Sequence, residues 1–368
     1  MISIYFQKEV MPLKLPSLSK KVLSIDFGGK EVKIVEGQVL NKAINIKKTF
    51  AISLPNEVYR DGEILDENQL ASLIKDYLKE NKVRTELAYG VINSSQIITR
   101  NISLPRVPER EIPSVIKYQI EDLFPLAPED YIINPLILGY RLEDEVEKID
   151  LLLVGTPKKI VIDHLALMKE IGLKPLVLDY QSNSMAKLLE YNSSINEFYN
   201  IRDMTIASID LGYINTKLCI INNGKILVSR VLDIGLKTLI DNLASFFDYS
   251  LEEREKKIFE IEDISHDSDD FNDYSRIVNI ARTSMDDLME KINVIFRFYI
   301  SRDTGNIINY ILLQGGLSNI NGMDNLFSNY FNTPSIRLLS LDNVRIEDDI
   351  SKFSNAAGGL IRIAEVQR

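Results

Sequence analysis

The chain has 368 residues but only one cysteine, two histidines and no tryptophan. With a single cysteine, Cys219, no disulfide can form within the chain, and the apolar stretch TKLCIINNG predicts a small buried hydrophobic residue rather than a nucleophile. The two histidines lie far apart and lack companions at the spacing of zinc ligands, so a zinc site and histidine-based catalysis have little support. We expect His164 to border a packed helix face and His266 to be solvated.

Long hydrophobic runs are also missing. No apolar stretch approaches the roughly 18 residues of a membrane-spanning helix, and the start MISIYFQKEVMPLKLPSLSK lacks the basic head and apolar run of a signal peptide. The sequence therefore predicts a cytoplasmic protein, with residues 1–19 as a loosely attached arm.

Basic residues are fewer than acidic ones. There are 43 basic and 53 acidic residues, which give a net charge of −10. This charge disfavours broad nucleic-acid binding and docking on anionic membranes.

What the chain does contain is an internal duplication, within a length that suggests about two domains. KVLSIDFG, KEVKIVEG and INIKKTFAISLP read as three strands of an antiparallel meander, followed by the amphipathic helix DENQLASLIKDYLKENK and the strand ELAYGVIN. The second half opens alike, with the strands TIASIDLG, NTKLCIIN and KILVSRVL before the helical LKTLIDNLASFF. Two β-β-β-α units predict two similar domains that face each other across a cleft.

Each unit places an aspartate at the end of its first strand, Asp26 and Asp210, just before a glycine hairpin. Taken alone, the pair Gly28 and Gly29 is most simply a tight turn. Taken twice, glycine hairpins offer backbone N–H groups that a phosphate can approach closely. Because the carboxylates would repel a bare phosphate, the pattern predicts a bound Mg²⁺ and a nucleotide tail.

A third glycine pair, Gly315 and Gly316, follows the apolar strand of NYILLQGGLSNINGMDNLFSNYF. It is either a plain strand-to-helix connection or, in this order, the floor under an adenine. In SLEEREKKIF, Glu253 and Lys256 are neighbours one helical turn apart. They could bracket a ribose or form an exposed helical ion pair, and both interpretations stay open.

The order of IDFGGKEVK, SIDLGYINTK, LLQGGLSNI and NAAGGLIRIA resembles the actin-like ATPase superfamily over roughly residues 20 to 365. Within it the chain most resembles the PilM family of type IV pilus assembly proteins, which is close to FtsA. The resemblance implies an α/β, actin-like (duplicated RNase H-like) two-lobed fold with an inserted small α/β subdomain. Its lobes would be residues 20–102, 177–203 and 345–368 for the first and 204–344 for the second, with 103–176 as the insert.

The stretch ISLPRVPEREIPSVIKYQIEDLFPLAPEDYIINPLIL carries the resemblance to PilM most specifically. Its apolar stripe from Ile112 to Leu123 predicts a helix that packs mainly in the core of the insert. The following segment predicts strand, helix and strand, with Thr156 as N-cap, Pro157 at the first helical position and Gly172 just past the helix end.

Carried over to this sequence, the resemblance implies a site for ATP and Mg²⁺. Asp26 and Asp210 would hold the metal, and the nucleotide would lie against Gly28, Gly29, Lys30, Gly212, Thr216, Glu253, Lys256, Gly315, Gly316 and Asn319. Gly29, Lys30 and Glu31 stand where the family commonly has small hydroxyl residues, Ile234 and Gly235 stand where it has two glycines, and Glu252 replaces a common alanine. These departures favour nucleotide binding with weak or absent ATPase activity.

The function that the resemblance implies is scaffolding. PilM binds the short N-terminal cytoplasmic tail of the membrane protein PilN in a groove between the main lobe and the insert, so we expect a PilN-like partner at the inner face of the membrane, with other pilus assembly components as further partners. No nucleic acid and no direct membrane insertion are expected.

Two other functions stay open on the residues alone. An actin-superfamily small-molecule kinase would need a carboxylate as general base beyond the two loop acids. An FtsA-like polymer former would be expected to end in a basic amphipathic helix, for which little sequence follows GLIRIAEVQR. The acidic run at 262–275 is expected to be a mobile surface loop rather than a calcium site, since it lacks the glycine and terminal glutamate of a calcium loop.

Overall fold

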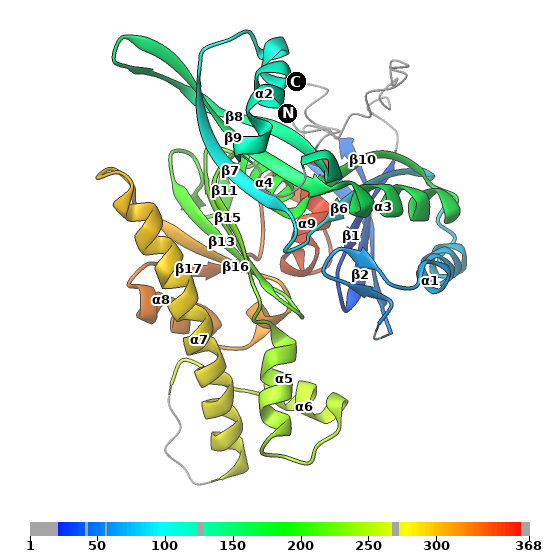
Figure 1. Ribbon diagram of the computed structural model, residues 1–368. Coiled ribbons are helices and arrows are strands. Elements are labelled where there is room, and N and C mark those ends of the chain that lie inside the picture. Colours follow the sequence, from blue (N-terminus) through cyan, green and yellow to red (C-terminus); the bar gives the residue numbers. More distant parts are fainter. Residues whose placement is uncertain (1–20, 41–42, 56, 124–127, 267–271, 362–368) are drawn as a thin grey trace.

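The computed structural model describes residues 21–40, 43–55, 57–123, 128–266 and 272–361. In these ranges the chain forms two lobes, each built on a mixed β-sheet, and a third sheet that projects from one end (Figure 1). The expected N-terminal arm, residues 1–19, lies outside the described residues.

The first lobe is built on a six-stranded sheet, and every residue of its strand β1 (Val22–Phe27) is buried. Strands β1 and β2 and strands β2 and β3 are antiparallel, whereas β1, β6 and β10 run parallel. In spatial order the strands are β10 (Lys174–Tyr180), β6 (Leu87–Ile92), β1 (Val22–Phe27), β2 (Glu31–Leu40), β3 (Ala43–Ser53) and β18 (Val344–Arg345). The predicted meander is confirmed.

The second lobe repeats this topology. Its first strand, β13, pairs antiparallel with β14 and parallel with β16, just as β1 pairs with β2 and with β6 in the first lobe. In spatial order the strands are β15 (Lys225–Leu232), β14 (Thr216–Asn222), β13 (Thr205–Leu211), β16 (Tyr310–Gln314) and β17 (Ser335–Arg337). Two sheets with the same connections confirm the predicted duplication.

A third, antiparallel sheet carries its own small core. It consists of β7 (Ile98–Pro105), β9 (Val146–Pro157) and β8 (Tyr131–Glu143), and helix α2 (Ile112–Leu123) packs on it. Ile112 and Ile116 of the predicted stripe are buried among the apolar residues of β9. The helix begins where the sequence predicts, since Pro113 costs no hydrogen bond in its first turn. The predicted stop at Pro125 lies outside the described residues.

The remaining elements are mostly helices. They are α1 (Glu67–Glu80), α3 (Lys158–Glu170), α4 (Gln181–Tyr191), α5 (Leu236–Ala244), α6 (Leu251–Phe259), α7 (Asp273–Ser301), α8 (Met323–Phe331) and α9 (Ile350–Gly359). Two short hairpins, β4 (Tyr59–Arg60) with β5 (Glu63–Ile64) and β11 (Ser194–Ile195) with β12 (Tyr199–Asn200), and the 3₁₀ turns η1 (Glu109–Glu111), η2 (Pro128–Asp130) and η3 (Gly316–Asn319) complete the fold.

Helices α4 and α9 lie between the two large sheets and join them. One core cluster contains apolar residues of both helices and of both sheets, including Cys219, which is buried as predicted. Gly358 lets α9 lie against α4, since a Cβ there would be 2.3 Å from the carbonyl oxygen of Ser184. The lobes therefore share a core rather than being linked by a hinge alone.

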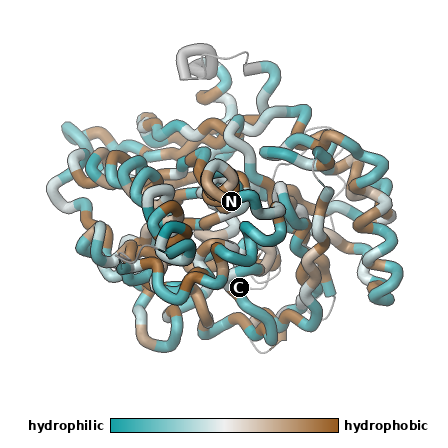
Figure 2. Tube along the Cα trace, turned by 90° about the horizontal axis from the view of Figure 1, so that it is seen from below, coloured by the Kyte–Doolittle hydropathy of each residue, from teal (hydrophilic) through white to brown (hydrophobic). Residues whose placement is uncertain are grey.

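The outer face of each large sheet is covered by other helices. In the first lobe α1 and α3 pack there, and in the second lobe α5, α6, α7 and α8 do so. Figure 2 shows hydrophobic and hydrophilic residues alternating along the chain, as amphipathic helices and strands require. In the part of the chain that is described, no helix is long and apolar enough to cross a membrane.

Helix α3 differs from the sequence prediction at its start. Thr156 still pairs with Ile132 in the β8–β9 ladder, so the strand continues through Pro157 and the helix begins at Lys158. Thr156 is therefore not the N-cap, and Pro157 holds that position. Gly172 follows the helix end with a φ of +96°, as predicted. Because α3 packs in the core of the first lobe, the insert boundaries of 103–176 stay a prediction.

His164 of α3 is fully buried in the first-lobe core. Its Nδ1–H donates to the carbonyl oxygen of Ile160 at 2.7 Å, and its Nε2 accepts from the hydroxyl of Tyr59 at 3.0 Å. Phe27 lies edge-on to the ring at 4.9 Å. Burial lowers the pKa of His164 from 6.5 to about 4, so the neutral ring is the folded form.

We predict that His164 makes the protein less stable as the pH falls. The stability contributed by the neutral ring is present above pH 6.5 and is lost as the pH approaches 4, because the unfolded chain then binds a proton that the folded chain does not. Between pH 7 and pH 5 this amounts to about 2 kcal/mol of unfolding free energy. Urea denaturation of His164→Gln at the two pH values should show a flatter dependence than the wild type, whereas the exposed His266→Gln keeps most of the wild-type slope. Equal slopes for His164→Gln and wild type would contradict the assignment.

Candidate functional site

The two predicted aspartates lie close together between the two lobes. Asp26 lies at the end of β1 and Asp210 near the end of β13, at equivalent points of the two sheets. A single amide nitrogen, Nδ2 of Asn355 in α9, lies 2.9 Å from Oδ2 of Asp210 and 3.5 Å from Oδ2 of Asp26. Both carboxylates are buried, so the duplicated strands bring two acids to one point.

The electrostatics of the two carboxyl groups differ. Burial raises the pKa of Asp26, and Asp210 adds to the rise, although Lys33 and Lys217 oppose it. Burial also acts to raise the pKa of Asp210, but Lys217, Lys33 and the hydrogen bond from Asn355 together outweigh it, so this pKa is lowered. Asp210 therefore ionises more readily than Asp26, and a cation bound between them would favour the charged form of both.

The acids open onto a cavity of about 260 Å³. Residues from both lobes line it, among them Asp26, Gly28, Gly29, Lys30, Lys33, Asp210, Gly212, Lys217, Glu255, Gly316, Asn319 and Lys352. Four lysines and several exposed backbone groups therefore surround the two acids. Such a lining suits a ligand that carries strong negative charge of its own together with a cation.

The two hairpins approach the cavity through glycine. A Cβ on Gly28 would lie 2.8 Å from the carbonyl oxygen of Glu31, and one on Gly212 would lie 2.6 Å from that of Asn215. At Gly235, the residue before α5, a Cβ would lie 2.5 Å from the carbonyl oxygen of Tyr213. No side chain fits at these points, so the backbone of both turns stays bare toward the ligand space.

Lys30 links the two lobes at the rim of the cavity. It lies on the first-lobe hairpin and forms an ion pair with Glu255 of α6 in the second lobe. Its ammonium group also lies 5.0 Å from the centre of the Tyr213 ring. The charge that replaces the expected hydroxyl residue is therefore placed at the cavity, in contact with the opposite lobe.

The third glycine stretch supplies polar groups without partners. Gly315 has a φ of +85°, and a Cβ there would lie 2.4 Å from Oδ1 of Asp210. Among the described residues, three buried side-chain oxygens accept no hydrogen bond. They are Oε1 of Gln314, Oδ1 of Asn319 and Oε1 of Gln181. Buried acceptors of this kind indicate a missing donor such as a nucleotide hydroxyl or amino group or an ordered water.

Comparison with known proteins agrees with this geometry. The model of the family described as type IV pilus assembly protein PilM matches residues 24–354. The chain belongs to this family. Three solved structures are similar over nearly the whole chain, at identities that show the fold alone.

The first is the PilM–PilN type IV pilus biogenesis complex, with a TM-score of 0.77 and 20% identity over 94% of this chain and 98% of that chain. The MreB5 protein of Spiroplasma citri bound to ADP has a TM-score of 0.57 and 15% identity over 95% and 98%. The ethanolamine utilization protein EutJ from Carboxydothermus hydrogenoformans has a TM-score of 0.50 and 15% identity over 93% and 90%. The predicted actin-like fold is confirmed.

Three residues predicted for the site of this PilM-family chain lie away from the cavity. Thr216 is buried and its hydroxyl donates to the carbonyl oxygen of Ile234, so it supports the second hairpin from behind. Glu253 reciprocally caps α6 with Ser250. Lys256 is exposed and pairs with Glu260 of the same helix. A ribose role for Glu253 and Lys256 stays a prediction.

Several residues of the site were not predicted from the sequence, among them Lys33, Lys217 and Lys352 of the cavity lining. Asn355 and Glu255 are described above, and Gln181, the first residue of α4, donates from Nε2 to Oδ1 of Asp26 at 2.7 Å. A weak signal existed for Asn355, which opens the NAAGG stretch, and for Glu255, which is one residue from Lys256. Gln181 carried no signal, because its contact spans 155 positions of sequence.

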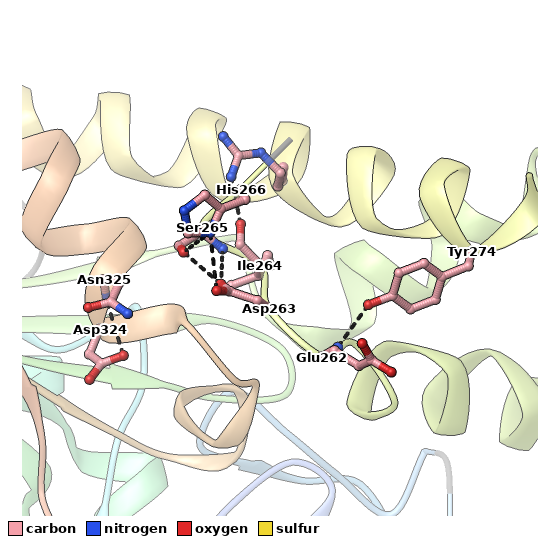
Figure 3. A network of polar contacts seen from close by, with 9 residues as sticks. Glu262, Asp263, Ile264, Ser265, His266, Tyr274, Asp324 and Asn325 are labelled. Atoms are coloured by element: carbon pink, nitrogen blue, oxygen red, sulfur yellow. Dashed lines mark hydrogen bonds and ion pairs between the residues drawn. The ribbon is translucent and has the colours of Figure 1, made fainter. Parts of the chain in front are cut away.

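The acidic segment around Asp263 forms a polar network of its own (Figure 3), and none of its residues lines the cavity. Oδ1 of Asp263 accepts from the backbone N–H of Ser265 at 2.7 Å, and Oδ2 lies 3.1 Å from Nδ1 of His266. The backbone N–H of Glu262 donates to the hydroxyl of Tyr274 at 2.9 Å. Residues 267–271 of the predicted loop lie outside the described residues, and its last three residues belong to α7, so the loop is shorter than expected.

No group of three or more histidine, cysteine, aspartate or glutamate side chains in the described ranges is arranged to hold a metal ion. Asp26 and Asp210 are only two carboxylates. A divalent cation between them would need water and phosphate oxygens to complete its shell, which is the usual coordination of Mg²⁺ beside a nucleotide. The residues present fit that group.

We predict that Asn355→Leu destabilises the protein without ligand. The substitution keeps the volume but removes the shared donor, leaving two buried carboxylates against each other, at a cost of about 1–3 kcal/mol of unfolding free energy. Urea denaturation measures this loss, and millimolar Mg²⁺ should recover part of it. Asn325→Leu, on the exposed side of α8, is the control. A loss no larger than in the control would show that Asn355 does not hold the pair together.

Proposed function

We propose that this chain is a nucleotide-binding scaffold of type IV pilus assembly. It acts in the cytoplasm at the inner face of the cell membrane and recruits a PilN-like inner-membrane protein through that protein's N-terminal cytoplasmic tail. The observation that carries the proposal is the pair Asp26 and Asp210, which meet between equivalent hairpins above one cavity in a chain of the PilM family.

The ligand that this cavity fits best is a nucleotide with Mg²⁺. Backbone N–H groups of the glycine turns would contact phosphate oxygens, and Lys30 would add a positive charge. Asp26 and Asp210 would hold the cation through its waters, and the cation would neutralise phosphate charge beside them. The similar MreB5 structure is bound to ADP, which supports the same class of ligand.

The proposal includes weak or absent ATP hydrolysis. Attack of water on a phosphate needs a group that orients or deprotonates the water, and none of the cavity acids is free for this role in a defined geometry. Asp26 and Asp210 are already engaged by Asn355, and Glu255 is engaged by Lys30. The other two acids of the lining are also paired, Glu31 with Lys352 and Asp61 with Ser95. A bound nucleotide would then serve as a structural ligand that holds the lobes in one arrangement.

The partner site is proposed at the junction of the first lobe and the third sheet. Strand β8 is half-buried along most of its length. Ile132 packs against the first-lobe core, Leu136 and Leu138 against the central cluster, and Ile133 and Ile137 against the core under α2. The similar PilM structure is a complex with PilN, which supports a PilN-like tail as the occupant.

We predict that Asp210→Asn weakens Mg²⁺-dependent nucleotide binding at least about tenfold, or roughly 1.4 kcal/mol. The substitution keeps the shape but removes the charge that attracts the cation. Titration of a fluorescent ADP analogue with Mg²⁺ or with EDTA measures the effect, and Asp241→Asn, an exposed aspartate on α5 paired with Lys237, is the control. Affinity that is unchanged in Asp210→Asn would remove this residue from the metal site.

We also predict that nucleotide and partner tail bind cooperatively. A synthetic peptide with the N-terminal sequence of the PilN-like protein should bind more tightly in the presence of Mg-ATP, by a coupling of about 1–3 kcal/mol. Reciprocally, the peptide should tighten nucleotide binding by the same factor. Isothermal titration with and without each ligand tests both. Peptide binding that is indifferent to nucleotide would remove the coupling but leave the scaffold role standing.

A further inference from the structure

Three arginines from distant parts of the chain lie on adjoining elements where the third sheet contacts the second lobe. We call Arg100 of β7, Arg230 of β15 and Arg302 after the end of α7 the arginine cluster. All three are exposed. Their elements are fixed to one another, since Nδ2 of Asn101 donates to the carbonyl oxygen of Leu227 at 3.2 Å and β15 contacts both β8 and α7.

The cluster has no acidic partner among the described residues. The guanidinium groups of Arg100 and Arg230 each donate to the carbonyl oxygen of the preceding residue, at 3.2 and 2.7 Å. Asp303 is the adjacent acid, but its Oδ1 accepts from the backbone N–H of Gly305. The pKa of Arg230 is lowered, first by partial loss of its water and then by the charges of Arg100 and Arg302. Three like charges therefore repel one another at this junction.

An apolar surface adjoins these charges. The guanidinium of Arg302 lies 5.3 Å from the centre of the Phe298 ring, which is 52% exposed. One turn earlier on the same face of α7, Val294 is 65% exposed. Positive charge beside an exposed aromatic ring is a typical composition of a protein-binding surface.

We infer that the arginine cluster and the adjoining face of α7 bind an acidic peptide segment of a partner protein, one that carries carboxylates and an apolar side chain. Carboxylates would neutralise Arg100, Arg230 and Arg302 together, and the apolar side chain would cover Phe298. Because the cluster includes residues of the third sheet and of the second lobe, the bound segment would also bridge these two parts of the molecule. The inference does not depend on the nucleotide site.

An acidic protein segment fits better than a membrane or a nucleic acid. Those two ligands present extended fields of negative charge, which a chain with a net charge of −10 would meet with repulsion around the small cluster. A short peptide presents its carboxylates only where the arginines are. The pair Phe298 and Val294 adds a contact that a phosphate backbone could not satisfy.

The test uses two readouts on the full chain that should move in opposite directions. Arg230→Gln removes a repulsion, so it should raise the midpoint of thermal unfolding at low salt and make it less dependent on salt than in the wild type. The same substitution should lower affinity for a fluorescein-labelled peptide of glutamates flanking one phenylalanine by about tenfold at 50 mM salt. Arg302→Gln should behave alike, whereas Arg84→Gln, at an exposed site in the first lobe, should change neither readout.

Opposite shifts in both cluster variants, with none in Arg84→Gln, support the inference. It is overturned if the wild type does not bind the peptide, if Arg84→Gln loses as much affinity as Arg230→Gln, or if the cluster variants are less stable than the wild type. Binding to phosphatidylserine vesicles or to single-stranded DNA that exceeds binding to the peptide would also overturn it. None of these results bears on nucleotide binding at Asp210, so the two proposals fail separately.

Discussion

Two buried carboxylates from opposite lobes share one amide nitrogen, and the rest of the site depends on that contact. Asp26 and Asp210 could not be held so close in a dry interior without a donor or a cation between them, because two like charges there repel strongly. Asn355 supplies the donor in this structure. Its position follows from the close seating of α9 on its neighbours, so the packing of the core determines the electrostatics of the site.

The close seating in turn requires glycine. A Cβ on Gly358 would meet Ser184 of α4, and one on Gly359 would lie 2.3 Å from Oγ of Ser24 in β1. Larger residues would push α9 away from both, and Asn355 would move out of reach of the aspartates. Gly358 and Gly359, which have no side chain, thus determine how close Asn355 lies to the two aspartates.

The sequence was sufficient for the sheets and the two acids, because strand patterns are local and the duplication repeats them. It was insufficient where contacts span the chain. Gln181 reaches Asp26 only through folding, and Glu255 rather than Glu253 turns toward the cavity because Glu253 is used to cap α6. Thr156 was placed at the helix start because threonine is a good N-cap, yet strand pairing with β8 outweighed that local preference.

The cluster of apolar side chains between the two large sheets has a consequence for how the molecule folds. Ile206 and Leu312 of the second lobe and Val35 and Ile44 of the first belong to the same cluster, so neither half can bury this surface without the other. Although the chain repeats one topology, a separated half would expose the apolar faces of its sheet to water. The two repeats are therefore parts of one cooperative folding unit, and rearrangements between them must proceed by sliding of α4 and α9 rather than by wide separation.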